Sequence, residues 1–400
     1  MANSILTVDM ITLKSLEILE NNLAVTRNVN RQYDKSFANV GAKIGDTLRI
    51  RLPDRALVTD GAALQVQDES QQKVSLTVAT QKHIGVNFTS AELTMSLDDF
   101  AELILKPRIS QLAASIDADV CNSYKQIGNS VGTAGTTPAT SLVLLQGQQK
   151  LNEFAAGMSP RYATVNPSAN ANLVEGMKGL FNPGSTLSRQ FKSGMMGEDV
   201  LGYTEINMSQ SIKQFTTGSR SSGATVATTV STEGATTIAL TTNGASDTIK
   251  AGDVFTVATV FAVNPQTRET TGSLYQFVVE ADATASGSAV TVTVPAMYTA
   301  THALATIDSF PASADAITFI GGVSTAYPQN LIYHKDAIAF VTADLLLPDG
   351  VAFAARKVHN GISMRIVRQY DINNDRMPCR IDVLYGYKVI RPEMACRLWG

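Results

Sequence analysis

The residues that could bind a metal or move a proton are scattered along the chain. Histidine is the commonest side chain in both roles, and the four histidines, His83, His302, His334 and His359, lie far apart in sequence. No His-Glu-x-x-His or Cys-x-x-Cys motif gathers such residues. We therefore expect surface or lightly buried histidines, no metal site and no cofactor.

Two pairs of aspartates could serve as general acid and base. Asp98 and Asp99 follow Ser96 at the start of a predicted helix, where carboxylates favour the positive end of the helix dipole, so the pattern indicates capping. Asp117 and Asp119 are two residues apart on that helix and face different directions, so we expect both to be solvated. Cys121 lies beside the apolar stripe of the same helix, which favours packing over reactivity.

No phosphate-binding loop is present either, because the chain has no Walker motif and no Gly-x-Gly-x-x-Gly between a strand and a helix. The sequence therefore predicts a protein that is not an enzyme. Arg49, Arg51 and Arg55 form a small basic patch that could meet phosphate or acidic partners, or could simply be a solvated strand face.

The composition excludes several classes of protein. The formal net charge of −3 over 400 residues shows no clustered basic excess, which argues against a dedicated nucleic-acid binder. The N-terminus lacks the basic and apolar regions of a secretory signal, and no stretch of about 18 apolar residues predicts a membrane span. Three scattered cysteines do not make a disulfide framework and fit a reducing cytosol.

The first third of the chain predicts helices and strands that reach outward. Residues 7–22 have apolar residues at helical spacing, and residues 47–52 alternate as a strand that ends at Pro53. The polar segment 54–73 separates this strand from further alternating runs at 74–78 and 84–88. Because such a long connection is unusual inside a compact domain, we expect a two-stranded arm that reaches a neighbouring subunit.

A long spine helix is predicted from Ser96 to about Ile127, kinked near Pro107 and ended by Gly128. Two shorter helices follow at 142–156 and 167–180, with a buried strand, 162–165, between them. The strands predicted near the C-terminus are 337–342, 364–370, 380–387 and 394–398.

The composition changes abruptly between Ser221 and Asn330. This stretch has eight acidic and only two basic residues, is rich in Thr, Ser, Ala and Gly, and contains apolar residues that mostly alternate. Alternation over runs bounded by turn residues is typical of strands, here 236–240, 254–263, 274–279 and 289–294. We interpret residues 217–330 as an all-β domain inserted into a mixed α and β host.

Taken in order, these elements resemble the major capsid (coat) proteins of tailed double-stranded-DNA bacteriophages, which have the Hong Kong 97 fold. Within that group the chain is similar to the P-twenty-two-type coat proteins, which carry an inserted β-domain. The resemblance lies in four stretches, 41–53, 90–100, 249–255 and 384–393.

The resemblance implies an α+β capsid fold in five parts. These are an N-terminal arm at 1–45, an extended β-arm with peripheral strands at 46–95, the spine helix at 96–128, an axial α/β domain at 129–216 and 331–400, and an inserted all-β barrel at 217–330.

The resemblance also implies a structural virion protein, assembled in the host cytoplasm, whose pentamers and hexamers close into an icosahedral shell around phage DNA. A scaffolding protein would direct a precursor shell that expands on packaging. Portal protein, weakly contacted DNA and a decoration protein are further candidate partners. The candidate intersubunit or scaffold contacts are Arg27, Arg31, Lys35, Arg49, Arg51 and Arg55. The alternative function is a β-rich adhesion or surface-layer module, suggested by the Thr-rich block.

Overall fold

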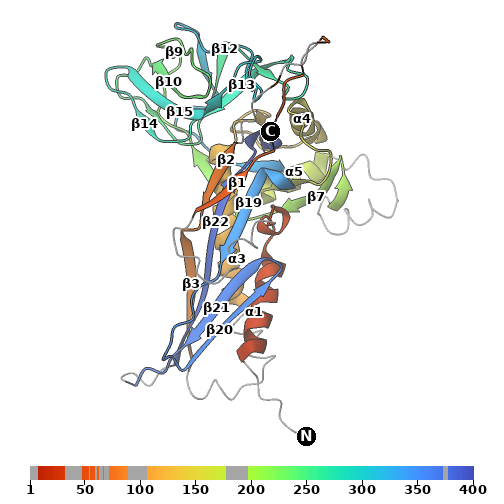
Figure 1. Cartoon of the computed structure of the whole chain (residues 1–400), viewed down its shortest axis with the longest axis vertical. Helices are drawn as coiled ribbons and strands as arrows, with labels where there is room; N and C mark the ends of the chain where they lie inside the picture. The colour runs from red at the N-terminus through yellow and green to blue at the C-terminus, as the bar shows by residue number, and fades with distance from the viewer. Residues whose placement is uncertain are drawn as a thin grey trace. The chain divides into compact units, whose positions relative to one another are not determined.

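The computed structural model describes residues 8–31, 47–53, 55–58, 61–62, 66, 72–88, 106–176, 197–372 and 377–400. The chain divides into two compact units (Figure 1). The first unit comprises Met1–Ile50, Lys73–Val120 and Ile338–Lys388, and the second comprises Arg51–Gln72, Cys121–Ala337 and Val389–Gly400. Each unit is therefore built from segments that are distant in sequence.

The first unit contains a five-stranded sheet in which β19, β22, β21 and β20 are neighbours in that order and β3 pairs with β22. Its strands are β3 (Thr80–Phe88), β19 (Ile338–Ala343), β20 (Phe353–His359), β21 (Ile362–Arg368) and β22 (Met377–Val389). β20 and β21 form a hairpin closed by Asn360 and Gly361, whose φ angles of 46° and 80° suit a type I′ turn.

Among the described residues, this unit contains the helices α1 (Val8–Asn22) and α3 (Lys106–Cys121). α1 lies along β20 and β21 (Figure 1) and buries Leu16 and Leu19. α3 buries the predicted stripe of Ile109, Leu112, Ala113, Ile116 and Val120. Since these positions repeat every three or four residues, each helix has one apolar side.

The α-helical part of the spine ends at Cys121, earlier than the predicted end near Ile127. After Cys121 the chain continues as a 3-10 helix, η5 (Asn122–Gln126), and Ile127 is extended. The predicted cap at Ser96, Asp98 and Asp99 lies outside the described residues. The described part of α1, Val8–Asn22, lies within the predicted range and ends at the predicted residue.

The predicted two-stranded arm agrees with the pairing of β1 (Thr47–Arg51) and β2 (Lys73–Thr77). Ile50 and Leu76 are buried, whereas Arg49 and Arg51 on the other face of β1 are exposed. β3 instead pairs along its whole length with β22.

The host part of the second unit is a six-stranded sheet in the order β4, β23, β18, β5, β7, β6. The strands are β4 (Ser130–Val131), β5 (Arg161–Val165), β6 (Gly197–Val200), β7 (Tyr203–Met208), β18 (Asn330–His334) and β23 (Ala395–Leu398). Helices α4 (Ser141–Glu153) and α5 (Pro167–Gly176) contribute Leu144, Leu151 and Leu173 to a core shared with this sheet. The amide of Ala169 donates to Asn166 Oδ1 at 3.1 Å, as expected of a helix cap.

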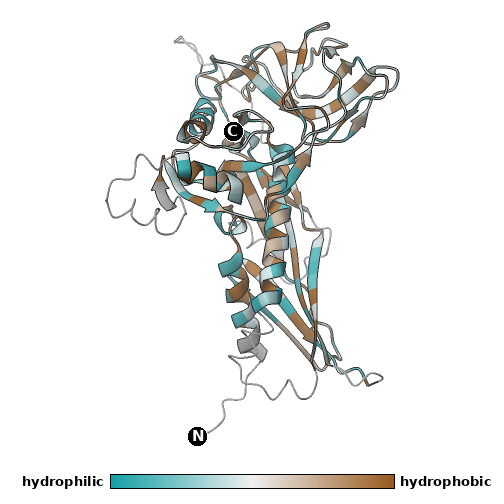
Figure 2. Ribbon diagram, turned by 180° about the vertical axis from the view of Figure 1, so that it is seen from behind, coloured by the Kyte–Doolittle hydropathy of each residue, from teal (hydrophilic) through white to brown (hydrophobic). Residues whose placement is uncertain are grey.

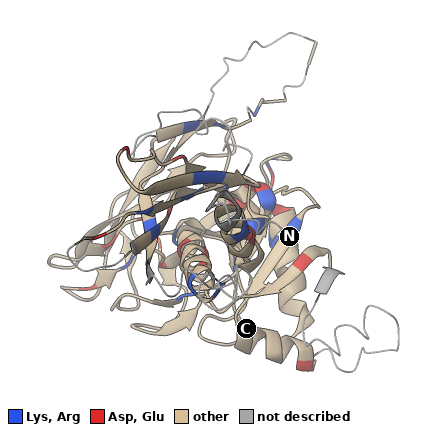
Figure 3. Ribbon diagram, turned by 90° about the horizontal axis from the view of Figure 1, so that it is seen from below, with Lys and Arg blue, Asp and Glu red and all other residues tan. Residues whose placement is uncertain are grey.

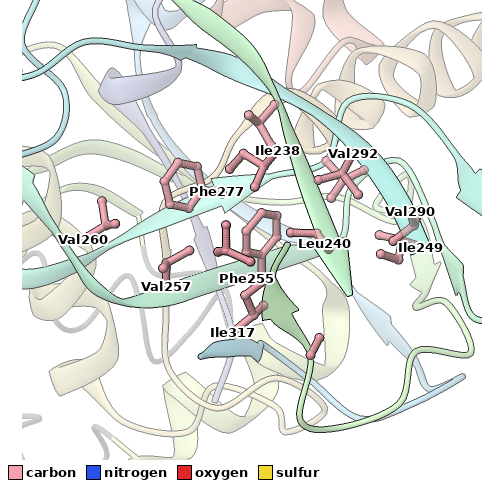
Figure 4. Close-up of a cluster of buried hydrophobic side chains, with 14 of the residues drawn as sticks. Ile238, Leu240, Ile249, Phe255, Val257, Val260, Phe277, Val290, Val292 and Ile317 are labelled. Atoms are coloured by element: carbon pink, nitrogen blue, oxygen red, sulfur yellow. The ribbon is translucent and has the colours of Figure 1, made fainter. Parts of the chain in front are cut away.

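The inserted block forms a separate core in the same unit. Figure 4 shows Phe255 and Phe277 packed among Ile238, Leu240 and Val257, and the two phenyl rings stack with centroids 5.3 Å apart. Apolar and polar residues follow one another along its strands (Figure 2), as strands with one buried face require.

The strand pairings of the block differ from the predicted closed barrel. All of 217–330 is described, and its strands form short sheets, β15–β10–β9, β13–β12–β16 and β11–β14, with register shifts in the two longest pairings. Such bulges interrupt a continuous ladder. The strands are β9 (Thr225–Val226), β10 (Ala235–Thr241), β11 (Thr248–Ile249), β12 (Val254–Val263), β13 (Thr270–Val278), β14 (Ala283–Thr284), β15 (Ala289–Met297) and β16 (Ile317–Phe319).

The two ends of the block leave the host side by side. β8 (Gln214–Thr216) pairs with β17 (Ala326–Pro328), and the amide of Thr217 donates to the carbonyl of Thr325 at 3.1 Å. Neighbouring ends are what an insertion into an existing fold requires.

Candidate assembly contacts and internal locks

Asp117 is the centre of a buried contact between α3 and the segment that follows α1. Its side chain accepts hydrogen bonds from the amides of Ala24, Val25 and Thr26 at 2.7, 3.3 and 3.0 Å, and from the hydroxyl of Thr26 at 2.6 Å. The residue is 2% exposed. The prediction that Asp117 is solvated was wrong, because the carboxylate satisfies backbone N–H groups that lack partners at the start of a short 3-10 turn, η1 (Thr26–Asn28).

Asp119 is not a simple solvated residue either. Lys82 on β3 forms an ion pair with it at 2.5 Å, and the hydroxyl of Tyr385 on β22 donates to the same carboxylate oxygen at 2.6 Å. Lys82 also donates to the carbonyl and hydroxyl of Ser115. The two aspartates do face different directions, as predicted, and each holds a different segment against α3.

A third contact joins the C-terminal end of α1 to the β20–β21 hairpin. The side-chain amide nitrogen Nδ2 of Asn360 donates to both carboxylate oxygens of Glu20, at 2.7 and 2.8 Å. His359 Nε2 lies 3.2 Å from Glu20, and Arg31 lies 3.8 Å from it while donating to the Asn360 carbonyl. The turn of the hairpin is therefore tied to the N-terminal helix within one subunit.

The structure describes five of the six predicted contact residues, and these five have different local surroundings. Arg27 is exposed, and Arg31 takes part in the Glu20 contact. Arg49 and Arg51 lie together on the exposed face of β1, whereas Arg55 pairs with Glu393 at 2.8 Å. Lys35 lies outside the described residues. In Figure 3, Lys and Arg occur on several different elements.

The segment between β1 and β2 exposes large apolar side chains. Val58 is 92% exposed and Val66 is 85% exposed. The ends of the segment are held, since the amide of Leu52 donates to the carbonyl of Gln72 at 2.9 Å. Burial of these two exposed valines against a partner would be favourable, because it removes apolar surface from water.

Buried charges join the inserted block to the host, and the sequence analysis did not identify them. Arg397 on β23 donates to the carbonyl of Gly252 at 2.7 Å and lies over the ring of Tyr124, 5.3 Å from its centroid. Within the block, Arg220 and Asp253 pair at 2.5 Å. One indication of this burial is present in the sequence: Arg397 is a charged residue within the short, otherwise apolar strand predicted at 394–398.

Three of the histidines lie in different surroundings, and His334 is more buried than the predicted surface or lightly buried position. His334 is buried beside Asp336, His302 stacks on Tyr298, and His359 contacts Glu20. Among the described residues no group of three or more His, Cys, Asp or Glu could hold a metal ion. No helix of the described part is long and apolar enough to cross a membrane. Cys121 is 1% exposed, in agreement with a packing role.

Comparison with solved structures finds phage capsids. The chain is similar to a structure from Mycobacterium phage Che8 at 13% identity, with 94% of this chain and 90% of that chain covered and a TM-score of 0.46. The capsid of Ralstonia phage GP4 matches at 8% identity, with 91% and 86% covered and a TM-score of 0.44. The CUS-3 coat protein I-domain matches at 25% identity over 26% of this chain and 98% of that chain, with a TM-score of 0.21.

Among curated proteins no match is found. A comparison with family models gives one that covers residues 1–400, described as P22 coat protein, gene protein 5. A match over the whole sequence includes the host, the arm and the inserted block together. The chain therefore belongs to the P22 coat protein family, whose role is structural rather than enzymatic.

Proposed function

We propose that this coat protein assembles, as pentamers and hexamers, into a closed icosahedral shell of the Hong Kong 97 type that encloses phage double-stranded DNA. The observation that carries the proposal is the coat-protein family match over residues 1–400. The adhesion or surface-layer alternative gains no support, because the Thr-rich block that suggested it falls inside the same match.

Each part of the subunit would have its own role in assembly. The N-terminal arm (1–45) and the β-arm (46–95) make intersubunit contacts, and the spine helix (96–128) carries the peripheral strands. Residues 129–216 and 331–400 surround the axis of each capsomer. The inserted domain (217–330) adds contact surface without altering the host core.

The β-arm exposes apolar and cationic side chains that a neighbouring subunit would cover. Val58 and Val66 are almost fully exposed, and Arg49 and Arg51 are exposed on β1. Covering an apolar side chain of this size stabilises a contact by about 1.5–3 kcal/mol. Repeated over every subunit, such contacts favour a closed shell over free chains.

Charged side chains would guide the binding of partners other than further copies of this chain. A scaffolding protein that directs a precursor shell would be steered by Arg27, Arg31 and Lys35, since charged patches raise association rates more than they stabilise a fold. DNA would be enclosed with few phosphate contacts, because the chain carries a net charge of −3. The portal and a decoration protein would bind the assembled shell, which expands when DNA enters.

The test is to express the full chain in the bacterial cytosol with and without a candidate scaffold and to image the product by electron microscopy. Closed shells that become uniform with scaffold would support the proposal. A monodisperse protein that forms no shell or sheet with any candidate scaffold would refute it.

Duplex DNA and scaffold binding, measured across a salt series, separate the two kinds of charged partner. We expect scaffold binding that weakens with salt and only weak DNA binding with a shallow dependence on salt. Submicromolar DNA binding at physiological salt, with no salt-dependent scaffold binding, would contradict the assignment of partners.

A further inference from the structure

Three charged side chains are buried together where the inserted block meets the last strand of the host. Arg220 and Asp253 are each 1% exposed, and Arg397 is fully buried. Two of the three are cations. Buried charges are ordinarily paired, because transfer of an unpaired ion out of water is costly. The cluster has two cations and only one anion, so one buried positive charge lacks a carboxylate within it.

Asp253 is already used by other donors. It accepts from Arg220 Nη1 at 2.5 Å and from the amides of Lys250 and Gly218 at 2.8 and 3.2 Å. Arg397 donates instead to two neutral acceptors, the carbonyl of Gly252 at 2.7 Å and Gln329 Oε1 at 3.4 Å. Among the described residues, Arg397 has no carboxylate of its own.

The aromatic neighbour of Arg397 compensates for only part of its burial. The ring of Tyr124 lies 5.3 Å from the guanidinium and attracts it through the negative face of the ring. Burial nonetheless lowers the pKa of the Arg397 guanidinium to about 10. Since that value is still well above neutrality, the cluster keeps one excess positive charge.

Four buried N–H groups of the same region have no acceptor among the described residues. They are Nε and Nη2 of Arg397, Nε of Arg220 and Nε1 of Trp399. Cys396 and Leu398 on β23 join the host core, whereas Arg397 between them belongs to the opposite face of the strand. Trp399 directly follows the end of β23, two residues after Arg397.

The side chain of Tyr327 connects these donors. Its ring meets the indole of Trp399 edge-on, with centroids 5.5 Å apart. Its hydroxyl oxygen lies 2.7 Å from the point where a Cβ at Gly321 would be, and the Gly321 carbonyl accepts from Arg220 Nη2 at 3.2 Å. The Tyr327 hydroxyl also interacts electrostatically with the guanidinium groups of Arg397 and Arg220, so the donors of Arg220, Arg397 and Trp399 lie near one aromatic residue.

We propose that this junction binds a small monovalent anion of the halide class, held by the N–H groups of Arg397, Arg220 and Trp399. A water molecule would accept hydrogen bonds from the N–H groups but would leave the excess positive charge in place. An anion would accept those hydrogen bonds and also neutralise the excess charge. Because the side chains are at most 1% exposed, a halide-sized ion suits the site better than a partner's carboxylate.

The chain has a single tryptophan, Trp399, and it is a donor of the proposed site. Iodide and bromide quench indole fluorescence on contact, so emission from purified full-length subunits reports occupancy. Gluconate is replaced by iodide at constant ionic strength. We expect quenching that saturates and is reversed by chloride, because a buried indole with 1% exposure is otherwise shielded from ions in solution.

The variant Arg397→Met removes the uncompensated charge and should abolish the saturable quenching. The matched control is Arg161→Met, another fully buried arginine, whose guanidinium donates to Asn152 and to the carbonyls of Gly157 and Ala156. That variant should keep the quenching. If Arg397→Met does not fold, competition between iodide and chloride in the wild-type subunit decides the matter.

Thermal unfolding gives a second readout, since a ligand that binds only the folded state raises the midpoint in proportion to the logarithm of its concentration. The midpoint should be higher in chloride than in gluconate at equal ionic strength. Equal midpoints, together with iodide quenching that is linear or absent, would overturn the proposal and leave ordered water as the partner of these N–H groups.

Discussion

The carboxylate of Asp117 on α3 accepts both the backbone N–H and the hydroxyl of Thr26, at 3.0 and 2.6 Å. Thr26 is 91 residues earlier in the chain and follows the N-terminal helix. One side chain on the spine helix therefore fixes where the N-terminal segment leaves α1. Asp119, two residues further along the same helix, holds β3 and β22.

We predict that Asp117→Asn destabilises the subunit. An amide offers one acceptor oxygen and turns an NH₂ group toward backbone donors, so buried N–H groups lose their partner at a cost of about 1–3 kcal/mol. Urea unfolding of the variant and the wild type gives the difference. Asp336→Asn, at a side chain that is 50% exposed, is the control and should change stability little. Equal stability of all three proteins would show that the Asp117 contact contributes nothing.

The hydroxyl of Tyr385 should make the subunit sensitive to alkali. Burial, and secondarily the hydrogen bond to Asp119, raise the pKa of Tyr385 above its usual value near 10. A raised pKa means that the folded state holds the proton more tightly, so this stabilisation is complete below about pH 10 and is lost as the pH rises further.

The comparison variant is Tyr385→Phe. It should lower stability at neutral pH by about 1–3 kcal/mol, because the Asp119 carboxylate loses a donor. It should also flatten the fall in unfolding free energy above about pH 10. Identical pH profiles for variant and wild type would mean that Tyr385 ionises as freely in the folded protein as in the unfolded one.

The cysteines should resist thiol reagents in the folded subunit. Burial raises the pKa of Cys379 to about 11 and that of Cys396 to about 12, which suppresses the reactive thiolate. Cys121 is 1% exposed. A colorimetric thiol assay should detect almost no reaction in native protein and all three thiols in denaturant. Rapid labelling of native subunits would show that these sites open readily.

Residues 217–330 should fold when produced alone. The block has its own buried core and neighbouring ends. A dispersed amide NMR spectrum is the expected result, and Phe255→Ala should cost about 3–5 kcal/mol because it leaves a cavity in that core. The control is Val323→Ser, at an exposed site in the same block. A random-coil spectrum of the isolated block at low temperature would contradict its description as a domain.

Local patterns in the sequence predicted most of the elements. α1, β1, β5 and β12 lie within one or two residues of their predicted bounds, because each has a clear apolar period and a turn or cap at its end. β20 was missed although Asn360-Gly361 is a strong hairpin signal, since the strand itself alternates poorly.

Long-range relationships could not be predicted in the same way. Asp117 looked solvated because its partners are backbone amides at 24–26, and no sequence pattern marks an amide as a donor to a distant side chain. The burial of Arg397 depends equally on Gly252 and Tyr124, which lie far away in the chain. Some of the predicted basic contact residues are exposed and others form internal ion pairs. The sequence did not separate the two groups, because the acidic partners are not neighbours in the sequence.

The central claim is that this coat protein closes into shells through contacts that include the exposed β-arm. The most direct measurement is electron microscopy of the scaffold-assisted assembly product of wild type beside Val58→Ser/Val66→Ser, with Val323→Ser as control. We expect closed shells for wild type and control, and folded subunits with few or no shells for the arm variant. Equally abundant, closed shells from the arm variant would contradict it.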